Sequence, residues 1–170
     1  MLLLGLGSNL SSSFGDRFEN LNLAISYLET YQIKIINRSS FYETPSYPDI
    51  KNPKFINLVV DVSTYLLPED LASVLIFVEE KLERKRIKKN EPRTCDIDII
   101  DYNGKVMEFT YKNLIFKVPH EKLIYRNFVL FPLQEIEPKW VHPKNKDSID
   151  VLINKLPNEE KKSILKITKS

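Results

Sequence analysis

The hydrophobic pattern along the chain switches repeatedly between the period of a strand and the period of a helix. Short apolar runs predict strands, and apolar residues at helical spacing predict helices. The predicted order over the first hundred residues is β-α-β-β-α-β, with elements over 2–7, 17–31, 33–42, 55–65 and 68–84, and a last strand that ends near Asp101. This order favours a ferredoxin-like α+β sandwich, in which helices pack on a sheet.

The pattern after Asp101 predicts smaller elements. Asn103 and Gly104 have the turn chemistry of a hairpin. Further on, the pattern predicts a strand over 114–118, a short helix over 127–136 and a last helix over 147–156. Residues 44–53 contain three prolines and are expected to form a loop. No repeat or long linker appears in the 170 residues, so we expect one domain over 1–170.

The most informative stretch of the chain is an acidic strand. Asp96 and Asp98 lie two residues apart and therefore share one face, while Cys95, Ile97 and Ile99 point into a core on the other. Two carboxylates roughly 6 Å apart repel by about 2–3 kcal/mol at an effective dielectric constant near 20. Mg²⁺ would relieve this repulsion, since it prefers oxygen ligands and binds few protein carboxylates. A solvated strand face is the alternative, and the pair alone does not decide between them.

A basic segment leads directly into this strand. Residues 83–93 contain six Lys or Arg and two Glu. Cations beside carboxylates that could hold Mg²⁺ are the groups that phosphoryl transfer requires. A solvated basic loop and a nucleic-acid-binding surface are the alternatives. The net charge of only +2, and the lack of an RNA-recognition signature, weaken the nucleic-acid interpretation.

Other motifs mainly exclude functions. No Walker sequence occurs, and Leu10 replaces the third glycine of a dinucleotide-binding fingerprint. His120 and His142 lie in no zinc-binding pattern, and Trp140 and His142, beside prolines, are expected to pack on the surface. The single cysteine and the absence of a long apolar run favour a cytoplasmic protein that does not bind a membrane.

Several blocks in order resemble the 6-hydroxymethyl-7,8-dihydropterin pyrophosphokinase family. The resemblance runs from about residue 2 to about residue 143, and its blocks are residues 6–10, 40–45, 55–57, 92–98, 118–120, 126–130 and 132–133. It implies a ferredoxin-like α/β/α sandwich with a mainly antiparallel sheet, usually monomeric. It also implies that pyrophosphate passes from ATP to the hydroxymethyl group of the pterin and that AMP is released. Residues 144–170 match only loosely, and we assign them no catalytic role.

The resemblance also implies roles for single residues. Asp96 and Asp98 would hold two Mg²⁺ ions, with ATP as co-substrate. The residues with catalytic roles would be the same two aspartates together with Arg84 and Arg93. The residues that bind ATP would be Glu79, Arg84, Arg86, Arg93, His120 and Arg126. The pterin would be sandwiched by Phe55 and Phe128, and its polar edge would be read by Asn57 and by the backbone around Thr44 and Pro45.

The basic segment departs from the family pattern. Glu83 stands where a glycine usually precedes the arginine, Asn90 and Glu91 replace a common Trp-Gly, and the segment is one residue shorter than in many relatives. Two other classes of function stay open on the residues alone. The chain could be a catalytically idle nucleotide- or RNA-binding module, or the small partner of an enzyme complex that docks through the proline-rich loop.

Overall fold

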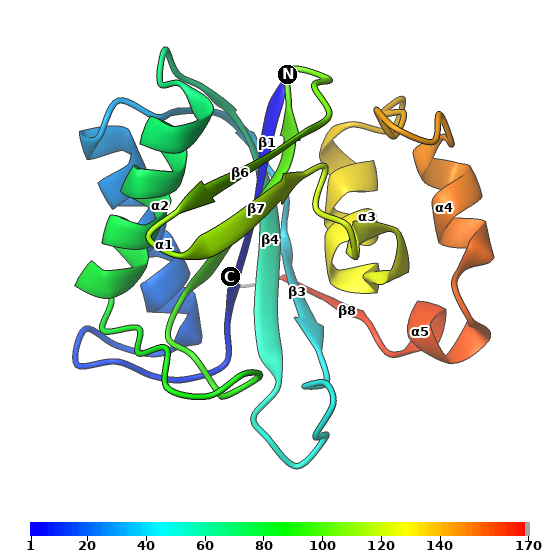
Figure 1. Ribbon diagram of the computed structural model, residues 1–170. Helices are drawn as coiled ribbons and strands as arrows, with labels where there is room; N and C mark the ends of the chain where they lie inside the picture. Colours follow the sequence, from blue (N-terminus) through cyan, green and yellow to red (C-terminus); the bar gives the residue numbers. More distant parts are fainter. Residues whose placement is uncertain (169–170) are drawn as a thin grey trace.

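The computed structural model describes residues 1–168, and a central sheet lies in it between two layers of helices (Figure 1). The sheet consists of β1 (Leu2–Ser8), β2 (Lys34–Arg38), β3 (Phe41–Thr44), β4 (Phe55–Ser63), β5 (Asp96–Tyr102) and β8 (Leu165–Ile167). The strand order is β5-β1-β4-β3-β8, β2 also pairs with β4, and all of these pairs are antiparallel. The predicted sandwich with a mainly antiparallel sheet is confirmed.

Each face of the sheet has its own helices and its own apolar core. The helices α1 (Arg17–Thr30) and α2 (Pro68–Lys81) cover one face, and α3 (Asn127–Ile136) and α4 (Ile149–Lys155) cover the other (Figure 1). Side chains of β1 alternate between the two cores, as strand geometry requires. Leu2, Leu4 and Leu6 belong to the first core, and Leu3 belongs to the second.

The segment after β5 differs from the predicted hairpin. Asn103 turns the chain as expected, with φ of 53°, but the next strand leaves the main sheet. Instead, β6 (Met107–Tyr111) and β7 (Leu114–Val118) form a separate two-stranded sheet. Lys112 and Asn113 connect them with φ of 48° and 62°, the left-handed conformation that a two-residue hairpin turn needs. This second sheet brings β7 into contact with β5.

Buried polar contacts account for two further differences from the sequence prediction. The run predicted as one strand over 33–42 is broken at Ser39, whose amide donates to the Val59 carbonyl at 2.9 Å and whose Oγ accepts from the Val59 amide at 3.0 Å. The expected surface position of Trp140 and His142 is wrong, because both are buried. Trp140 Nε1 donates to the buried Asp101 carboxylate at 2.9 Å.

The C-terminal part contains short elements that the apolar pattern did not predict. A 3-10 helix (Leu123–Tyr125) precedes α3, and α5 (Asn158–Lys162) precedes β8. The last predicted helix is shorter than expected, as α4 ends at Lys155. No helix within residues 1–168 combines the length and apolar composition needed to cross a lipid bilayer.

Candidate active site

The two aspartates of β5 lie beside glycines of β1. In the antiparallel register, Asp96 is opposite Gly7 and Asp98 is opposite Gly5. Ile97 and Ile99 on the other face of β5 are buried, as the alternation predicts. A Cβ atom on residue 7 would lie only 3.0 Å from the Asn57 amide oxygen, and one on residue 5 would lie 3.2 Å from the Ile100 side chain. The site therefore depends on a small residue at position 7.

Arginines bind both carboxylates. The Arg84 guanidinium lies 2.7 Å from Asp96 Oδ1, and Arg93 lies 3.0 Å from Asp96 Oδ2. Burial opposes ionisation, but these two arginines outweigh it and lower the pKa of Asp96 to about 2. Asp98 contacts Arg126 at 3.0 Å. Burial and the neighbouring charge of Asp96 nevertheless raise the pKa of Asp98, so the site still favours additional positive charge there.

Glu79 of α2 lies beneath the arginines. It is 2% exposed and accepts hydrogen bonds from Arg84 and from the Ile97 amide, both at 2.8 Å, and from Arg86. Burial raises the pKa of Glu79 to about 7, although both arginines lower it. Arg84 thus bridges Glu79 to Asp96. The arrangement fixes two guanidinium groups at one side of the carboxylate pair.

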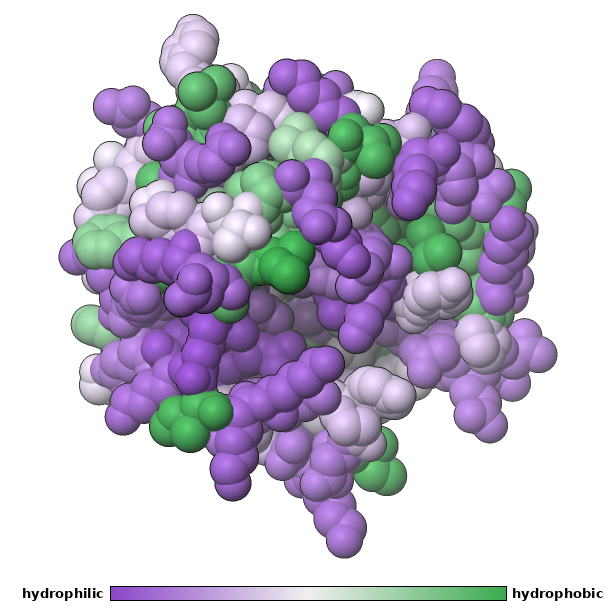
Figure 2. Space-filling view, viewed as in Figure 1, coloured by the Kyte–Doolittle hydropathy of each residue, from purple (hydrophilic) through white to green (hydrophobic). Residues whose placement is uncertain are grey.

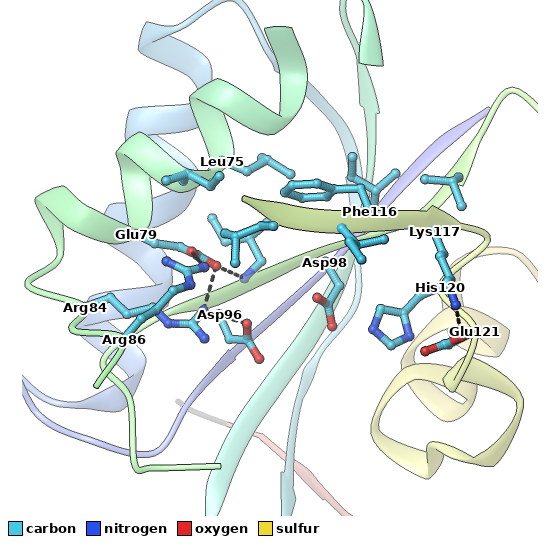
Figure 3. Close-up of a pocket in the computed structure, with 16 residues that line it drawn as sticks. Leu75, Glu79, Arg84, Arg86, Asp96, Asp98, Phe116, Lys117, His120 and Glu121 are labelled. Carbon is cyan, nitrogen blue, oxygen red and sulfur yellow. Dashed lines mark hydrogen bonds and ion pairs between the residues drawn. The ribbon is translucent and has the colours of Figure 1, made fainter. Parts of the chain in front are cut away.

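A cleft of about 350 Å³ opens over these groups (Figure 3). Its charged side contains Glu79, Arg84, Arg86, Asp96, Asp98 and His120, and its apolar side contains Leu75, Ile76, Leu114 and Phe116. In Figure 2, hydrophilic side chains gather around the lower left of this face, where the segment between α2 and β5 lies. Sequence reasoning missed the apolar wall, although the spacing of Leu114 and Phe116 in β7 places both on one face. The cleft suits a ligand with an anionic end and a flat apolar end.

His120 follows β7 and lies on the Asp98 side of the cleft (Figure 3). Its Nδ1 accepts a hydrogen bond from the Lys122 amide at 3.1 Å. In the neutral ring the proton is therefore on Nε2, which is left as a donor. Burial lowers the pKa of His120, although Asp98 raises it. Near neutral pH this histidine is an uncharged hydrogen-bond donor.

The aromatic residues assigned to the pterin lie against two of the arginines. The Arg93 guanidinium is 4.9 Å from the centre of the Phe55 ring, and that of Arg126 is 5.4 Å from the centre of the Phe128 ring. The assigned polar residues lie at the adjoining strands, and the buried Asn57 donates to Thr44 Oγ at 3.0 Å. Among the described residues, those that line the 350 Å³ cleft do not include Thr44, Pro45, Phe55, Asn57 or Phe128. Arg93 and Arg126 connect this second group to the carboxylates.

Asn9 is a site residue that lies in one of the blocks that resemble the family, but the sequence analysis assigned it no role. Its buried side chain accepts from the Arg93 amide at 2.7 Å and donates to Ser46 Oγ at 3.0 Å and to the Pro53 carbonyl at 3.1 Å. Asn9 therefore ties both ends of the proline-rich loop to Arg93. The sequence signal that could have identified Asn9 is its position as a polar residue directly after a buried strand.

Glu83 occupies a backbone position that usually requires glycine. Its φ is 68°, and the amides of Glu83 and Arg84 donate to the carbonyls of Glu80 at 2.9 Å and Glu79 at 3.0 Å. This is the pattern of a helix C-terminus with a left-handed residue. The Glu83 carboxylate also accepts hydrogen bonds from the Ser13 amide, at 3.1 Å, and from its hydroxyl. The side chain thus attaches the start of the basic segment to the loop after β1.

The metal expected from the sequence would depend on two carboxylates only. Within residues 1–168, His, Cys, Asp and Glu side chains do not gather in groups of three or more that could hold a metal ion. Asp96 and Asp98 fit Mg²⁺, which takes its remaining ligands from water and phosphate oxygens. The raised pKa of Asp98 is consistent with a site that a cation would stabilise.

Comparisons with known proteins agree with the geometry. The family described as 7,8-dihydro-6-hydroxymethylpterin-pyrophosphokinase (HPPK) matches residues 3–138. The chain is 38% identical over 140 residues to the 2-amino-4-hydroxy-6-hydroxymethyldihydropteridine pyrophosphokinase of Aquifex aeolicus, with 82% of each chain covered. It is 34% identical over 155 residues to the enzyme of the same name from Synechocystis, with 91% of this chain and 75% of the relative covered.

The fold is also similar to solved structures. Plasmodium falciparum HPPK-DHPS, in a crystal structure with SDX-DHP, superposes with a TM-score of 0.75 at 19% identity. The match covers 99% of this chain and 47% of that one. The chain thus spans less than half of the Plasmodium protein, and this similarity shows the fold alone.

Proposed function

The chain belongs to the 7,8-dihydro-6-hydroxymethylpterin-pyrophosphokinase family, and on this premise we propose how its cleft acts on ATP and a pterin. The protein is an enzyme that transfers pyrophosphate from ATP to the hydroxymethyl group of 6-hydroxymethyl-7,8-dihydropterin. The products are AMP and the pterin diphosphate, and the reaction belongs to folate biosynthesis.

The observation that carries the proposed site is the pair Asp96 and Asp98, which arginines hold at the charged end of the cleft. The ATP phosphates would take guanidinium contacts from Arg84, Arg86, Arg93 and Arg126 and a neutral donor from His120. Guanidinium groups bind phosphate oxygens in bidentate fashion, so they hold the chain of phosphates in one orientation. Glu79 would act by orienting Arg84 and Arg86. The apolar wall would hold the base.

Asp96 and Asp98 are the residues that would hold the two Mg²⁺ ions. When bound, the ions would neutralise phosphate charge as it shifts during the reaction. The carboxylates already carry arginine partners, so phosphate binding would draw these arginines toward the ligand and leave carboxylate oxygens free. The exchange keeps the site close to electrical balance.

The pterin would stack against Phe55 and Phe128, with Asn57 and the backbone at Thr44 and Pro45 at its polar edge. The hydroxymethyl oxygen would then attack the β-phosphorus. A new oxygen–phosphorus bond forms, the bond from the β-phosphorus to the bridging oxygen of the α-phosphate breaks, AMP leaves, and the hydroxyl proton is released to water. Alignment and charge neutralisation supply most of the rate in such transfers. We further propose that the protein is a monomer and that it works in the cytoplasm. The single, fully buried Cys95, which fits a reducing compartment, supports the cytoplasmic location only.

Calorimetric titration of an ATP analogue, with and without Mg²⁺, tests this site. The wild-type protein should bind the analogue more tightly with Mg²⁺ than without it. In Asp98→Asn that difference should shrink, because an amide does not supply an anionic ligand. An equal effect of Mg²⁺ on both proteins would contradict the assignment.

A further inference from the structure

The chain beyond α4 lies outside the family match, which ends at residue 138. It nevertheless returns to the sheet through α5 and β8 and runs beside α3 (Figure 1). We propose that this C-terminal segment, residues 157–167, positions Phe128 for the pterin and acts through Asn127. The inference rests on the proposed function, because it assumes that Phe128 stacks on the substrate.

Asn127 carries the first connection. It is the first residue of α3, between Arg126 and Phe128, and its side chain is buried. Its Nδ2 donates to the Glu160 carbonyl at 2.7 Å and to Ser163 Oγ at 3.1 Å. A buried amide that loses its partners is costly, so these two bonds hold the first turn of α3 against α5. That turn also carries Phe128.

Strand β8 carries the second connection. It pairs with β3, with Lys166 opposite Tyr42 and Leu165 opposite Glu43. Lys166 also lies 3.5 Å from Glu135, near the end of α3, and Glu135 accepts a 2.6 Å hydrogen bond from the Tyr42 hydroxyl. The C-terminal segment therefore touches both β3, which ends at Thr44, and α3. These are two of the elements assigned to the pterin.

The same helix offers a control contact, which is more exposed than those of Asn127. Gln134, one residue before Glu135, donates to Asp150 Oδ1 of α4 at 2.7 Å. The contact attaches α3 to its neighbour with one side-chain amide, as Asn127 does, but near the opposite end of the helix from Phe128. Loss of the Gln134 contact loosens α3 without releasing its first turn.

The experiment measures KM for the pterin and for ATP in the full-length chain, below the melting temperature of each variant. Asn127→Ala removes both hydrogen bonds and should raise the pterin KM by roughly 3- to 10-fold, which is the worth of about one hydrogen bond. The ATP KM should change by less than about twofold, because Arg84, Arg86 and Arg93, which would also bind the phosphates, lie on the segment between α2 and β5 and not on α3. Gln134→Ala should leave both constants near wild type. Glu160→Ala should too, because the carbonyl that accepts from Asn127 is retained.

Phe128→Ala separates the inference from the proposed function. If Phe128→Ala raises the pterin KM and Asn127→Ala does not, the positioning role is wrong and the stacking role stands. If Phe128→Ala has no effect on the pterin KM, the stacking assignment itself is wrong. An equal rise in Gln134→Ala would also overturn the inference, because any loosening of α3 would then suffice. Should Asn127→Ala fail to fold, Ser163→Ala removes one acceptor and should raise the pterin KM to a smaller extent, and an unchanged KM there would refute the role.

Discussion

The guanidinium of Arg93 lies 4.9 Å from the centre of the Phe55 ring. The same guanidinium is 3.0 Å from Asp96, and Arg126 repeats the arrangement between Phe128 and Asp98. Each carboxylate is therefore linked through one arginine to one of the two aromatic rings assigned to the pterin. The rings would contact the pterin and the carboxylates would hold the ions that bind ATP, so changes at the rings and at the carboxylates should be separable by ligand.

Removal of either ring should weaken pterin binding. Phe55→Ala or Phe128→Ala should reduce pterin affinity by roughly 1–3 kcal/mol, the range for lost stacking and burial. ATP affinity should change little, since the arginines remain. Calorimetry with each ligand separately checks this. Lower nucleotide affinity with intact pterin affinity would mean that the two substrates occupy the opposite positions.

Neutralisation of either carboxylate should nearly abolish turnover but should affect stability differently. Asp96→Asn should lower the melting temperature, because it removes ion pairs with Arg84 and Arg93. Asp98→Asn should hold or raise it, because burial and Asp96 already disfavour the charge on Asp98. Thermal unfolding at pH 7 measures both. Near-normal activity in either variant would remove the main support for the site.

The lowered pKa of Asp96 predicts the pH range of its contribution. The folded-state pKa of about 2 lies below the ordinary value of 3.8. The stabilisation is thus fully present above about pH 4 and is lost as the pH falls through about 2. The difference in melting temperature between wild type and Asp96→Asn should close over that interval. A difference that persists at pH 2 would mean that the ion pairs do not cause it.

The fold was predictable where the apolar residues follow the period of a helix or of a strand. The apolar pattern predicted the site only where its residues lie on a single strand. Alternation in β5 is enough to place Asp96 and Asp98 on one face. Alternation could not show that Trp140 is buried, because Trp140 packs in the second apolar core and donates to Asp101, 39 residues away in sequence. Nor could it place Arg126 against Asp98, which depends on how α3 packs against the sheet. Contacts between distant segments determine these features.

His120 should act as a neutral donor. His120→Ala should raise the ATP KM more than His120→Asn, since Asn retains an N–H donor. The lowered pKa also means that the neutral ring stabilises the fold above the ordinary pKa of 6.5, and that this is lost as the pH falls through the folded-state value. As the pH is lowered from 8 to 5, the melting temperature should therefore fall less in His120→Asn than in the wild-type protein. If the melting temperatures of wild type and His120→Asn fell equally at acid pH, His120 would be excluded as a cause of that fall.

Glu83 should be hard to replace except by glycine. Glu83→Ala removes the hydrogen bonds to Ser13 and keeps the left-handed backbone, where φ is 68°. Glu83→Gly also loses the hydrogen bonds but relieves the backbone. We expect the melting temperature to be lowest in Glu83→Ala, with Glu83→Gly above it. The reverse order would show that the backbone at this position is not strained.

The nucleotide product tests the central claim most directly. The protein is incubated with ATP, Mg²⁺ and 6-hydroxymethyl-7,8-dihydropterin, and the nucleotides are separated and identified. Attack at the β-phosphorus predicts AMP in amounts equal to the pterin diphosphate, and only when both Mg²⁺ and pterin are present. Stoichiometric ADP, or AMP that forms without the pterin, would contradict pyrophosphate transfer in this cleft.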